Sequence, residues 1–310
     1  MTERDDGRCA EAARFQRIDD AFRRGDLEAL RAAVPDPSAI PNGSLPDTIG
    51  SCLVYAIYHS PFEFIRTLLD LGADPNTPVD DGFPPLIAAL SKTREAPGAA
   101  RRDDVDEVVR LLLSQGADPN QRGINDWTPL HMAVAERNML AGYRLVESGA
   151  DPDLRTRIDE YDTAIEMAQR EGLTGLVDLL TTRGRPARRR LRSGLTELLD
   201  IPGSGELVRR QQRHRVRLRM WLAAGDPVRW QLVSEPVEVA RLDDDGVTLD
   251  ADVYISRGHL MNGLFYGLDG MRVGGLRVLE VAPHLAYGEA GVPEVIPPNA
   301  VLTVEVAVKG

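Results

Sequence analysis

One five-residue string occurs three times in the chain, and this repetition constrains the fold more than any other feature. Residues 72–76 and 116–120 both read Gly-Ala-Asp-Pro-Asn, and residues 149–153 differ only in ending with Asp153. An apolar pattern of helical period precedes each copy. The glycine therefore falls where a helix ends, a position that favours the left-handed backbone conformation. The string marks the ends of three successive structural units.

A second kind of string lies upstream of these helix ends. Residues 85–89 read Pro-Leu-Ile-Ala-Ala, and residues 128–133 read Thr-Pro-Leu-His-Met-Ala. Proline suits the first turn of a helix, where its missing N–H has no bond to lose. The unit is therefore two short helices and a turn. Glycines 116 and 149 are 33 residues apart, whereas the earlier spacing is 44 because of a polar stretch, residues 91–104, which we expect to be a surface loop.

These strings resemble the signatures of ankyrin repeats, and the resemblance covers residues 15–184. It implies an all-α ankyrin-repeat solenoid of about five repeats, with degenerate ends at residues 22–37 and 162–184 because a terminal repeat needs a polar outer face. We expect residues 1–14 to be a flexible N-terminal tail. In such a repeat, His131 is expected to bridge backbone groups of neighbouring turns rather than to bind metal.

Ankyrin repeats imply a module that binds a protein partner through exposed turn tips. Aromatic residues at these tips are the candidate contacts, although an aromatic there also serves as filler between repeats. The candidate partner-binding residues are Trp127, Phe83 and Tyr161.

Arginines gather directly after the repeats. Residues 185–219 contain eleven Arg against three acidic residues, a net +8 within a chain of net charge −11. Such clusters bind nucleic acid, anionic lipid or an acidic partner, and solvated linkers share the same composition. We expect residues 185–205 to be an Arg-rich linker, because residues 202–205, Pro-Gly-Ser-Gly, break any helix. The negative total charge makes nucleic acid an unlikely partner.

Beyond residue 205 the apolar period changes from helical spacing to alternation. Residues 215–220, 247–255 and 302–308 alternate apolar and polar side chains, as half-buried strands do. Between the last two, residues 259–268 carry leucines at intervals of four, which predicts one short helix across the sheet. Residues 206–310 are therefore expected to form an antiparallel α+β domain.

Four consecutive motifs in this domain look like those of FKBP-type peptidyl-prolyl isomerases. They are residues 267–275, 282–289, 296–300 and 302–306, whereas the resemblance is thin between residues 213 and 255. The chain is thus expected to be multidomain, with an all-α ankyrin-repeat solenoid followed by an α+β FKBP-like domain, an antiparallel sheet with one short helix.

The resemblance implies the isomerisation of X-Pro bonds, which rotate slowly against a barrier of about 18 to 20 kcal/mol. An apolar pocket accelerates rotation by removing water from the amide, so neither a nucleophile nor a cofactor is needed. The tyrosine hydroxyl of the family's pocket holds the substrate carbonyl. The positions implied for a proline-containing peptide segment are Tyr287, Val295, Ile296, Leu264, Leu260, Met261, Val304 and Trp230.

Several of these positions depart from the family pattern. Leu264 stands where the family has an indole ring at the base, or floor, of the pocket, and Val304 stands where the family has a phenylalanine. The pocket therefore keeps the opposite side, its roof, and loses much of its floor. Trp221 and Trp230 are candidates to refill that volume. The alternative function is a catalytically silent adaptor whose FKBP-like domain is only a docking surface.

Composition excludes several other classes of protein. Hydrophobic residues make up 43% and charged residues 27%, as in ordinary globular proteins. Two cysteines rule out a disulfide framework, and five scattered histidines argue against structural zinc. No apolar run approaches the roughly 18 to 20 residues of a membrane helix. We therefore expect a cytoplasmic protein with no metal, no cofactor and no membrane contact.

Overall fold

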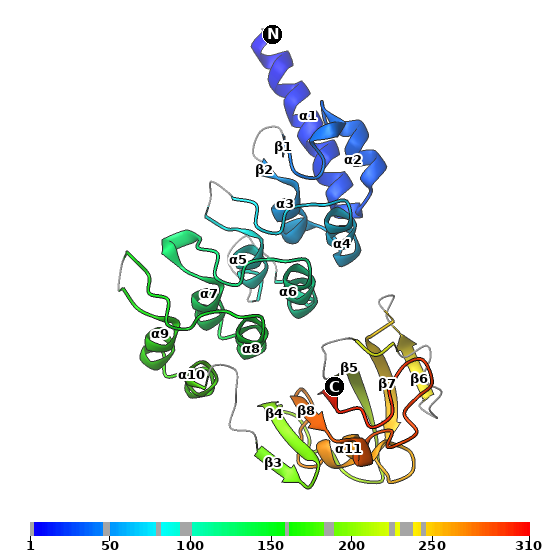
Figure 1. The fold of residues 1–310 in the computed structure, drawn as a ribbon. Helices are drawn as coiled ribbons and strands as arrows, with labels where there is room; N and C mark the ends of the chain where they lie inside the picture. Colours follow the sequence, from blue (N-terminus) through cyan, green and yellow to red (C-terminus); the bar gives the residue numbers. More distant parts are fainter. Residues whose placement is uncertain are drawn as a thin grey trace. The chain divides into compact units, whose positions relative to one another are not determined.

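The computed structural model describes residues 3–45, 50–78, 82–93, 101–158, 161–182, 189–222, 227–229, 238–242 and 246–310. The chain divides into two compact units, Met1–Gly184 and Arg185–Gly310. Figure 1 shows a helical first unit and a second unit built on a sheet. The expected order of an all-α part and an α+β part is confirmed.

Five helix pairs make up the first unit in the part of the chain that the structure describes. Successive pairs pack against one another in sequence order (Figure 1). The pairs are α1 (Glu3–Arg24) with α2 (Leu27–Ala33), α3 (Cys52–His59) with α4 (Phe62–Asp70), α5 (Pro85–Leu90) with α6 (Val105–Ser114), α7 (Pro129–Ala135) with α8 (Met139–Glu147), and α9 (Ala164–Arg170) with α10 (Thr174–Thr181). The connections contain η1 (Pro37–Ala39), η2 (Ile124–Asp126) and a hairpin of β1 (Ser44–Leu45) and β2 (Gly50–Ser51).

The start of the chain differs from the expected flexible tail. Helix α1 begins at Glu3 and runs to Arg24, so residues 3–14 belong to the first helix pair. Sequence reasoning placed the first helix too late because this stretch is mostly charged and lacks a long apolar stripe. No helix among the described residues is long and apolar enough to cross a membrane.

Asparagine at the end of the repeated string connects one repeat to the next. The Asn76 side chain donates to the carbonyl of Gly116 at 2.9 Å and accepts from the Asp118 N–H at 2.6 Å. Asn120 makes the same two bonds to the following copy, at 3.3 and 2.8 Å. In the last copy Asp153 replaces asparagine, and an ionised carboxylate has no donor for a carbonyl.

His131 bridges neighbouring turns, as the sequence predicts. Its Nδ1 accepts from the Thr128 N–H at 3.2 Å, and its Nε2 lies 3.1 Å from the carbonyl oxygen of Asp162. The ring is therefore neutral, with its proton on Nε2. Burial lowers the pKa of His131. The Thr128 hydroxyl lies 2.9 Å from the same Nδ1, and the two residues together cap the start of α7.

The second unit is an antiparallel sheet with one short α-helix in the described residues. Its strands run in the order β3-β4-β8-β9-β5-β7-β6. They are β3 (Arg189–Arg192), β4 (Leu195–Ile201), β5 (Arg213–Leu222), β6 (Glu238–Leu242), β7 (Leu249–Tyr254), β8 (Leu276–Val281) and β9 (Leu302–Val308), with α11 (Asn262–Gly267) and η4 (Pro283–Leu285).

The expected linker contains two of these strands. β4 pairs with β8 from Leu195 opposite Val281 to Ile201 opposite Leu276. β3 pairs with β4 and carries three of the arginines. The sheet therefore begins before residue 206, and the expectation of a linker over residues 185–205 is corrected for residues 189–201. The physical reason is that β4 supplies alternate buried side chains, Leu195 and Leu199 among them.

The core of this unit lies between one face of the sheet and α11. β5 contributes Val216, Leu218 and Met220, and β9 contributes alternate residues from Leu302 to Val308. Helix α11 contacts β4 and β8 (Figure 1). This alternation confirms the apolar faces predicted for the two strands.

Candidate functional site

Two glycines let α11 lie close against the sheet. A Cβ on Gly263 would lie 2.4 Å from a methyl of Val281, and one on Gly267 would lie 2.2 Å from a methyl of Leu279. Real Cβ atoms do not approach so closely, so larger residues would push the helix outward. Sequence reasoning missed this role, although the four-residue spacing of the glycines on one helix face is a usable signal.

A buried arginine holds the end of α11. Arg277 on β8 donates from Nη1 to the carbonyls of Gly267 and Asp269, at 2.7 and 3.1 Å. Its other nitrogens contact Asp200 at 3.1 Å and Glu197 at 3.2 Å. A cation at a helix C-terminus pairs with carbonyls that have no partner inside the helix. Arg277 therefore positions the helix that carries Leu264.

Three of the expected pocket residues lie inside the core. Leu260 is 8% exposed, Leu264 is 5% exposed and Val304 is fully buried, and all three belong to one cluster. Met261 is partly buried against the same cluster. The structure thus brings the expected floor residues together, but as packed core.

A hollow of about 470 Å³ opens beside the loop that follows η4. Val292 and Ile296 close this loop through two backbone hydrogen bonds of 2.8 Å each. The hollow therefore has a wall of fixed shape on that side. It is lined by Leu222, Ala290, Val292, Pro293, Glu294, Val295, Ile296, Pro297 and Pro298. Two of the expected residues, Val295 and Ile296, are among them.

Tyr287 lies at the other end of this loop. Its ring is partly buried against the core cluster, and its carbonyl accepts from the Gly291 N–H at 3.1 Å. The Asn299 N–H donates to the carbonyl of Gly288 at 2.9 Å, which ties the two ends of the loop together. Tyr287 and Ile296 thus pack on the same core from one closed loop.

Trp221 and Trp230 were the two candidates to fill the floor of the pocket, and only Trp221 lies in the part of the chain that the structure describes. Met220 and Leu222 on β5 pack on the core, so strand alternation directs Trp221 between them to the opposite face. Trp221 does not refill the floor. Trp230 lies outside the described residues.

The opposite face of β5 carries charged side chains, of which Arg215 is exposed and Arg219 is buried. Arg219 and Glu305 form an ion pair of 3.0 Å with side chains only 2% and 3% exposed, and Arg219 also donates to Thr248 at 2.9 Å. Arg217 donates twice to Asp250 at 2.9 Å and lowers its pKa through these hydrogen bonds. The alternation at residues 215–220 predicted a half-buried strand, and on its polar face Arg217 and Arg219 are paired with acidic side chains.

The three aromatic candidates of the first unit lie on or beside linked turns. The Ile124 N–H donates to the carbonyl of Gly82, next to Phe83, and Trp127 directly follows η2. Arg157 donates to the Asp126 carboxylate at 3.1 and 2.5 Å, which joins the next turn. Phe83 and Trp127 are partly buried.

Tyr161 differs in being 59% exposed. Its carbonyl accepts from Arg155 at 2.6 Å, and the same arginine pairs with Glu166. A hydrogen bond therefore holds the backbone at Tyr161, while its side chain is exposed. Tyr161 is the most accessible of the three candidate contacts.

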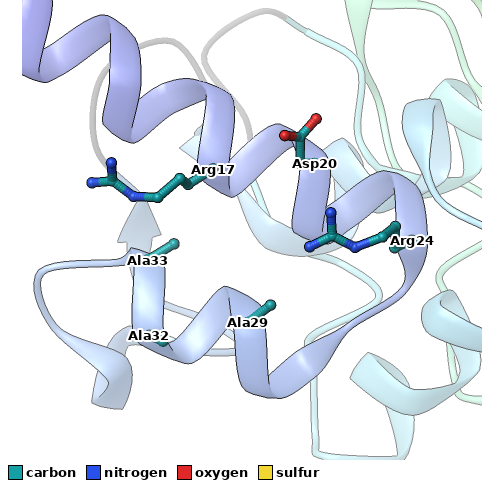
Figure 2. A pocket seen from close by; sticks show the side chains of 6 residues that line it. All are labelled: Arg17, Asp20, Arg24, Ala29, Ala32 and Ala33. Carbon is teal, nitrogen blue, oxygen red and sulfur yellow. The ribbon is translucent and has the colours of Figure 1, made fainter.

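A second hollow, of about 340 Å³, lies between α1 and α2. Figure 2 shows Arg17, Asp20 and Arg24 along α1, with alanines on the facing helix. The lining residues are Arg17, Asp20, Arg24, Ala29, Ala32 and Ala33. A prolyl ring needs apolar walls on several sides, whereas half of these side chains are charged. The hollow beside Ile296 is the better candidate for an apolar ligand.

Comparison with known families supports both parts of this description. Residues 242–309 match the family model of the FKBP-type peptidyl-prolyl cis-trans isomerase. Residues 53–96 and 99–141 match the model of ankyrin repeats. The first two copies of the repeated string and the loop around Ile296 lie within these ranges, whereas the third copy, at residues 149–153, lies outside them.

Similar proteins carry FKBP names. The chain is 52% identical over 50 residues to the chloroplastic peptidyl-prolyl cis-trans isomerase FKBP16-4 of Arabidopsis thaliana, covering 16% of this chain and 21% of that protein. It is 36% identical over 78 residues to the 39 kDa FK506-binding nuclear protein of Drosophila melanogaster, covering 23% and 22%. Against the peptidyl-prolyl cis-trans isomerase FKBP9 of Mus musculus it is 37% identical over 87 residues, covering 27% and 15%.

These matches span less than a quarter of each relative's length. The family-model match at residues 242–309 covers the segment that contains the glycine-spaced helix, the closed loop and the last strand. The chain therefore carries matches to ankyrin repeats in its first unit and, in its second, a C-terminal match to the FKBP-type peptidyl-prolyl cis-trans isomerase family.

Proposed function

We propose that the C-terminal unit isomerises X-Pro bonds and that the proline-containing segment enters the hollow beside Val295 and Ile296. The observation that carries this proposal is the hollow itself. It is apolar on most sides, has a volume of about 470 Å³, and is bounded by a loop that backbone hydrogen bonds hold closed. Small-molecule sites are commonly concave and apolar in this way.

The proposed chemistry requires no covalent step. The planar amide resists rotation because its resonance form separates charge across the C–N bond. Transfer of that amide from water to the apolar walls disfavours the charge-separated form and lowers the barrier. In this proposal Tyr287 supplies one hydroxyl that orients the substrate carbonyl, and Ile296 excludes water.

The ankyrin repeats contribute a protein-binding surface in the same proposal. Ankyrin repeats generally mediate protein interactions. Phe83, Trp127 and Tyr161 lie on or beside successive linked turns of this chain, where a partner would meet all three. We also propose a cytoplasmic location, which fits the free, buried thiol of Cys52. Cell fractionation with an antibody to the chain tests that location.

Binding of a short proline peptide to the full chain tests the prolyl site. Ile296→Asp places an unpaired carboxylate in an apolar wall and should abolish binding. Val295→Ser changes a partly buried residue and should weaken binding while the fold is retained. Val301→Asp is the matched control because Val301 is exposed. Equal peptide affinity in all four proteins would contradict the proposed site.

Partner binding is tested with Trp127→Ala in the full chain. If the turn tips make the interface, the variant keeps the helix content of the wild type and loses partner affinity. An unchanged affinity, or loss of helix content, identifies Trp127 as filler between repeats.

A further inference from the structure

Two neighbouring aromatic residues on α11 form a platform at the edge of the core. The rings of Phe265 and Tyr266 lie 5.0 Å apart between centroids and are nearly perpendicular, at 73°. Phe265 is buried and Tyr266 is partly exposed. The apolar ring is thus fixed by the core while its neighbour reaches the surface.

Three arginines from separate parts of the chain lie on this platform. The Arg192 guanidinium lies 3.6 Å from the centroid of the Tyr266 ring. Arg257 donates to the Tyr266 hydroxyl and lies 5.4 Å from the same ring. Arg210 lies 5.2 Å from the centroid of Phe265. Cation–π contacts of this kind hold a guanidinium in place while its N–H groups stay available.

The charge of this group is only partly neutralised. Arg210 pairs with Asp269 at 3.0 Å, and both side chains are about half exposed. Arg192 and Arg257 are exposed, and neither lies within ion-pair distance of a carboxylate among the described residues. The pKa of Tyr266 is lowered first by a hydrogen bond from Arg192 and then by the positive charges of Arg192 and Arg257.

The strand that supplies Arg192 lies at the end of the sheet. In the described residues β3 pairs only with β4, and its exposed Arg190 adds a further cation. An edge strand offers backbone N–H and C=O groups to an additional extended segment. The edge strand β3 therefore carries both a backbone edge open to pairing and the fixed guanidinium group of Arg192.

We propose that this arginine–aromatic surface, formed by Arg192, Arg210, Arg257, Phe265 and Tyr266, binds an extended acidic peptide segment of another protein. Guanidinium groups bind carboxylates with two parallel hydrogen bonds, and the edge of β3 accommodates the peptide backbone.

Charge and geometry favour an acidic peptide over nucleic acid. Single-stranded nucleic acid binds by stacking its bases on aromatic faces. Here the rings of Tyr266 and Phe265 already carry guanidinium groups, so a base would have to displace one. A peptide carboxylate needs no ring and reaches the outward N–H groups directly.

The test measures binding of a short labelled polyglutamate peptide to the full chain, with polyglutamine of the same length and single-stranded oligothymidylate as comparison probes. Polyglutamate should bind, and its affinity should fall as salt rises. The double variant Arg192→Gln with Arg257→Gln should weaken binding by about tenfold or more. Arg215→Gln is the matched control, because Arg215 is exposed on β5, four strands from β3, and should leave affinity unchanged.

A further variant separates positioning from charge. Tyr266→Ala retains every arginine but removes the platform, so binding should weaken several-fold while its salt dependence stays that of the wild type. The double arginine variant should instead reduce the salt dependence. Polyglutamate binding that the double variant leaves intact, preferential binding of oligothymidylate, or no binding of polyglutamate would each overturn the proposal.

Discussion

Arg277 donates a 2.7 Å hydrogen bond to the carbonyl of Gly267, so a buried guanidinium on β8 holds the last turn of α11. The same side chain contacts Asp200 and Glu197 and is 4% exposed. One residue therefore connects the first long strand of the unit with the helix above the core. This contact fixes the position of Leu264 relative to the sheet.

Replacement of Arg277 by leucine should strongly destabilise the second unit. The variant leaves two carboxylates without their buried partner and two carbonyls without a donor. Removal of one member of a buried ion pair costs about 3 to 5 kcal/mol. Denaturant unfolding monitored for each unit measures the effect. Arg272→Leu serves as the control, since Arg272 is exposed, and a similar loss in both variants would contradict the assigned role.

The asparagine bridges predict how strongly neighbouring repeats are coupled. Asn120→Ala removes two hydrogen bonds between repeats, so the free energy of unfolding of the first unit should fall by about 1 to 3 kcal/mol. Gln169→Ala on the exposed face of α9 should have almost no effect. If both variants unfold at the same denaturant concentration, the bridge does not couple the repeats.

The buried histidine predicts a pH dependence of stability. Burial lowers the pKa of His131 in the folded chain, whereas the unfolded chain takes up the proton near pH 6.5. Below that pH the unfolded state binds more protons, so stability falls as pH decreases. His131→Gln loses hydrogen bonds at neutral pH but also loses this proton uptake. The stability difference between wild type and variant should therefore shrink from pH 7 to pH 5, and a constant difference would refute the neutral ring.

A substitution at Leu264 tests whether the pocket has room for the indole ring that the family has at its floor. Because Leu264 is packed in the core, Leu264→Trp should overpack it and destabilise the second unit by about 1 to 3 kcal/mol. Leu207→Trp is the control at an exposed leucine. Unchanged stability together with faster isomerisation would show that an empty floor exists.

Local patterns in the sequence predicted the parts of the fold that depend on local physics. Glycine at helix ends, proline in first turns and alternation in β5, β7 and β9 all follow from short-range geometry. β4 was missed because its pairing with β8 joins residues 195–201 to residues 276–281, and no local signal reports such a distant partner. The arginine-rich sequence of β3 was likewise interpreted as a linker, because no local signal reports its pairing with β4.

The candidate site was predicted less completely than the fold. The motif that contains Val295 and Ile296 shapes a local loop, and that loop borders the hollow. The burial of Leu264 and Val304 depends on how far α11 lies from the sheet, which Gly263, Gly267 and Arg277 determine together. The pairing of Arg219 with Glu305 depends on the register of β5 with β9, which the alternation of either strand alone does not specify.

The rate of X-Pro isomerisation catalysed by the full chain is the most direct test of the proposed function. A short proline peptide interconverts over tens to hundreds of seconds without a catalyst. The wild type should accelerate this exchange in proportion to its concentration, and Tyr287→Phe should slow the catalysed rate by roughly two- to tenfold, the worth of one hydrogen bond. An exchange rate that the wild type leaves at its uncatalysed value, although the peptide binds, would contradict the isomerase and identify the second unit as a docking domain.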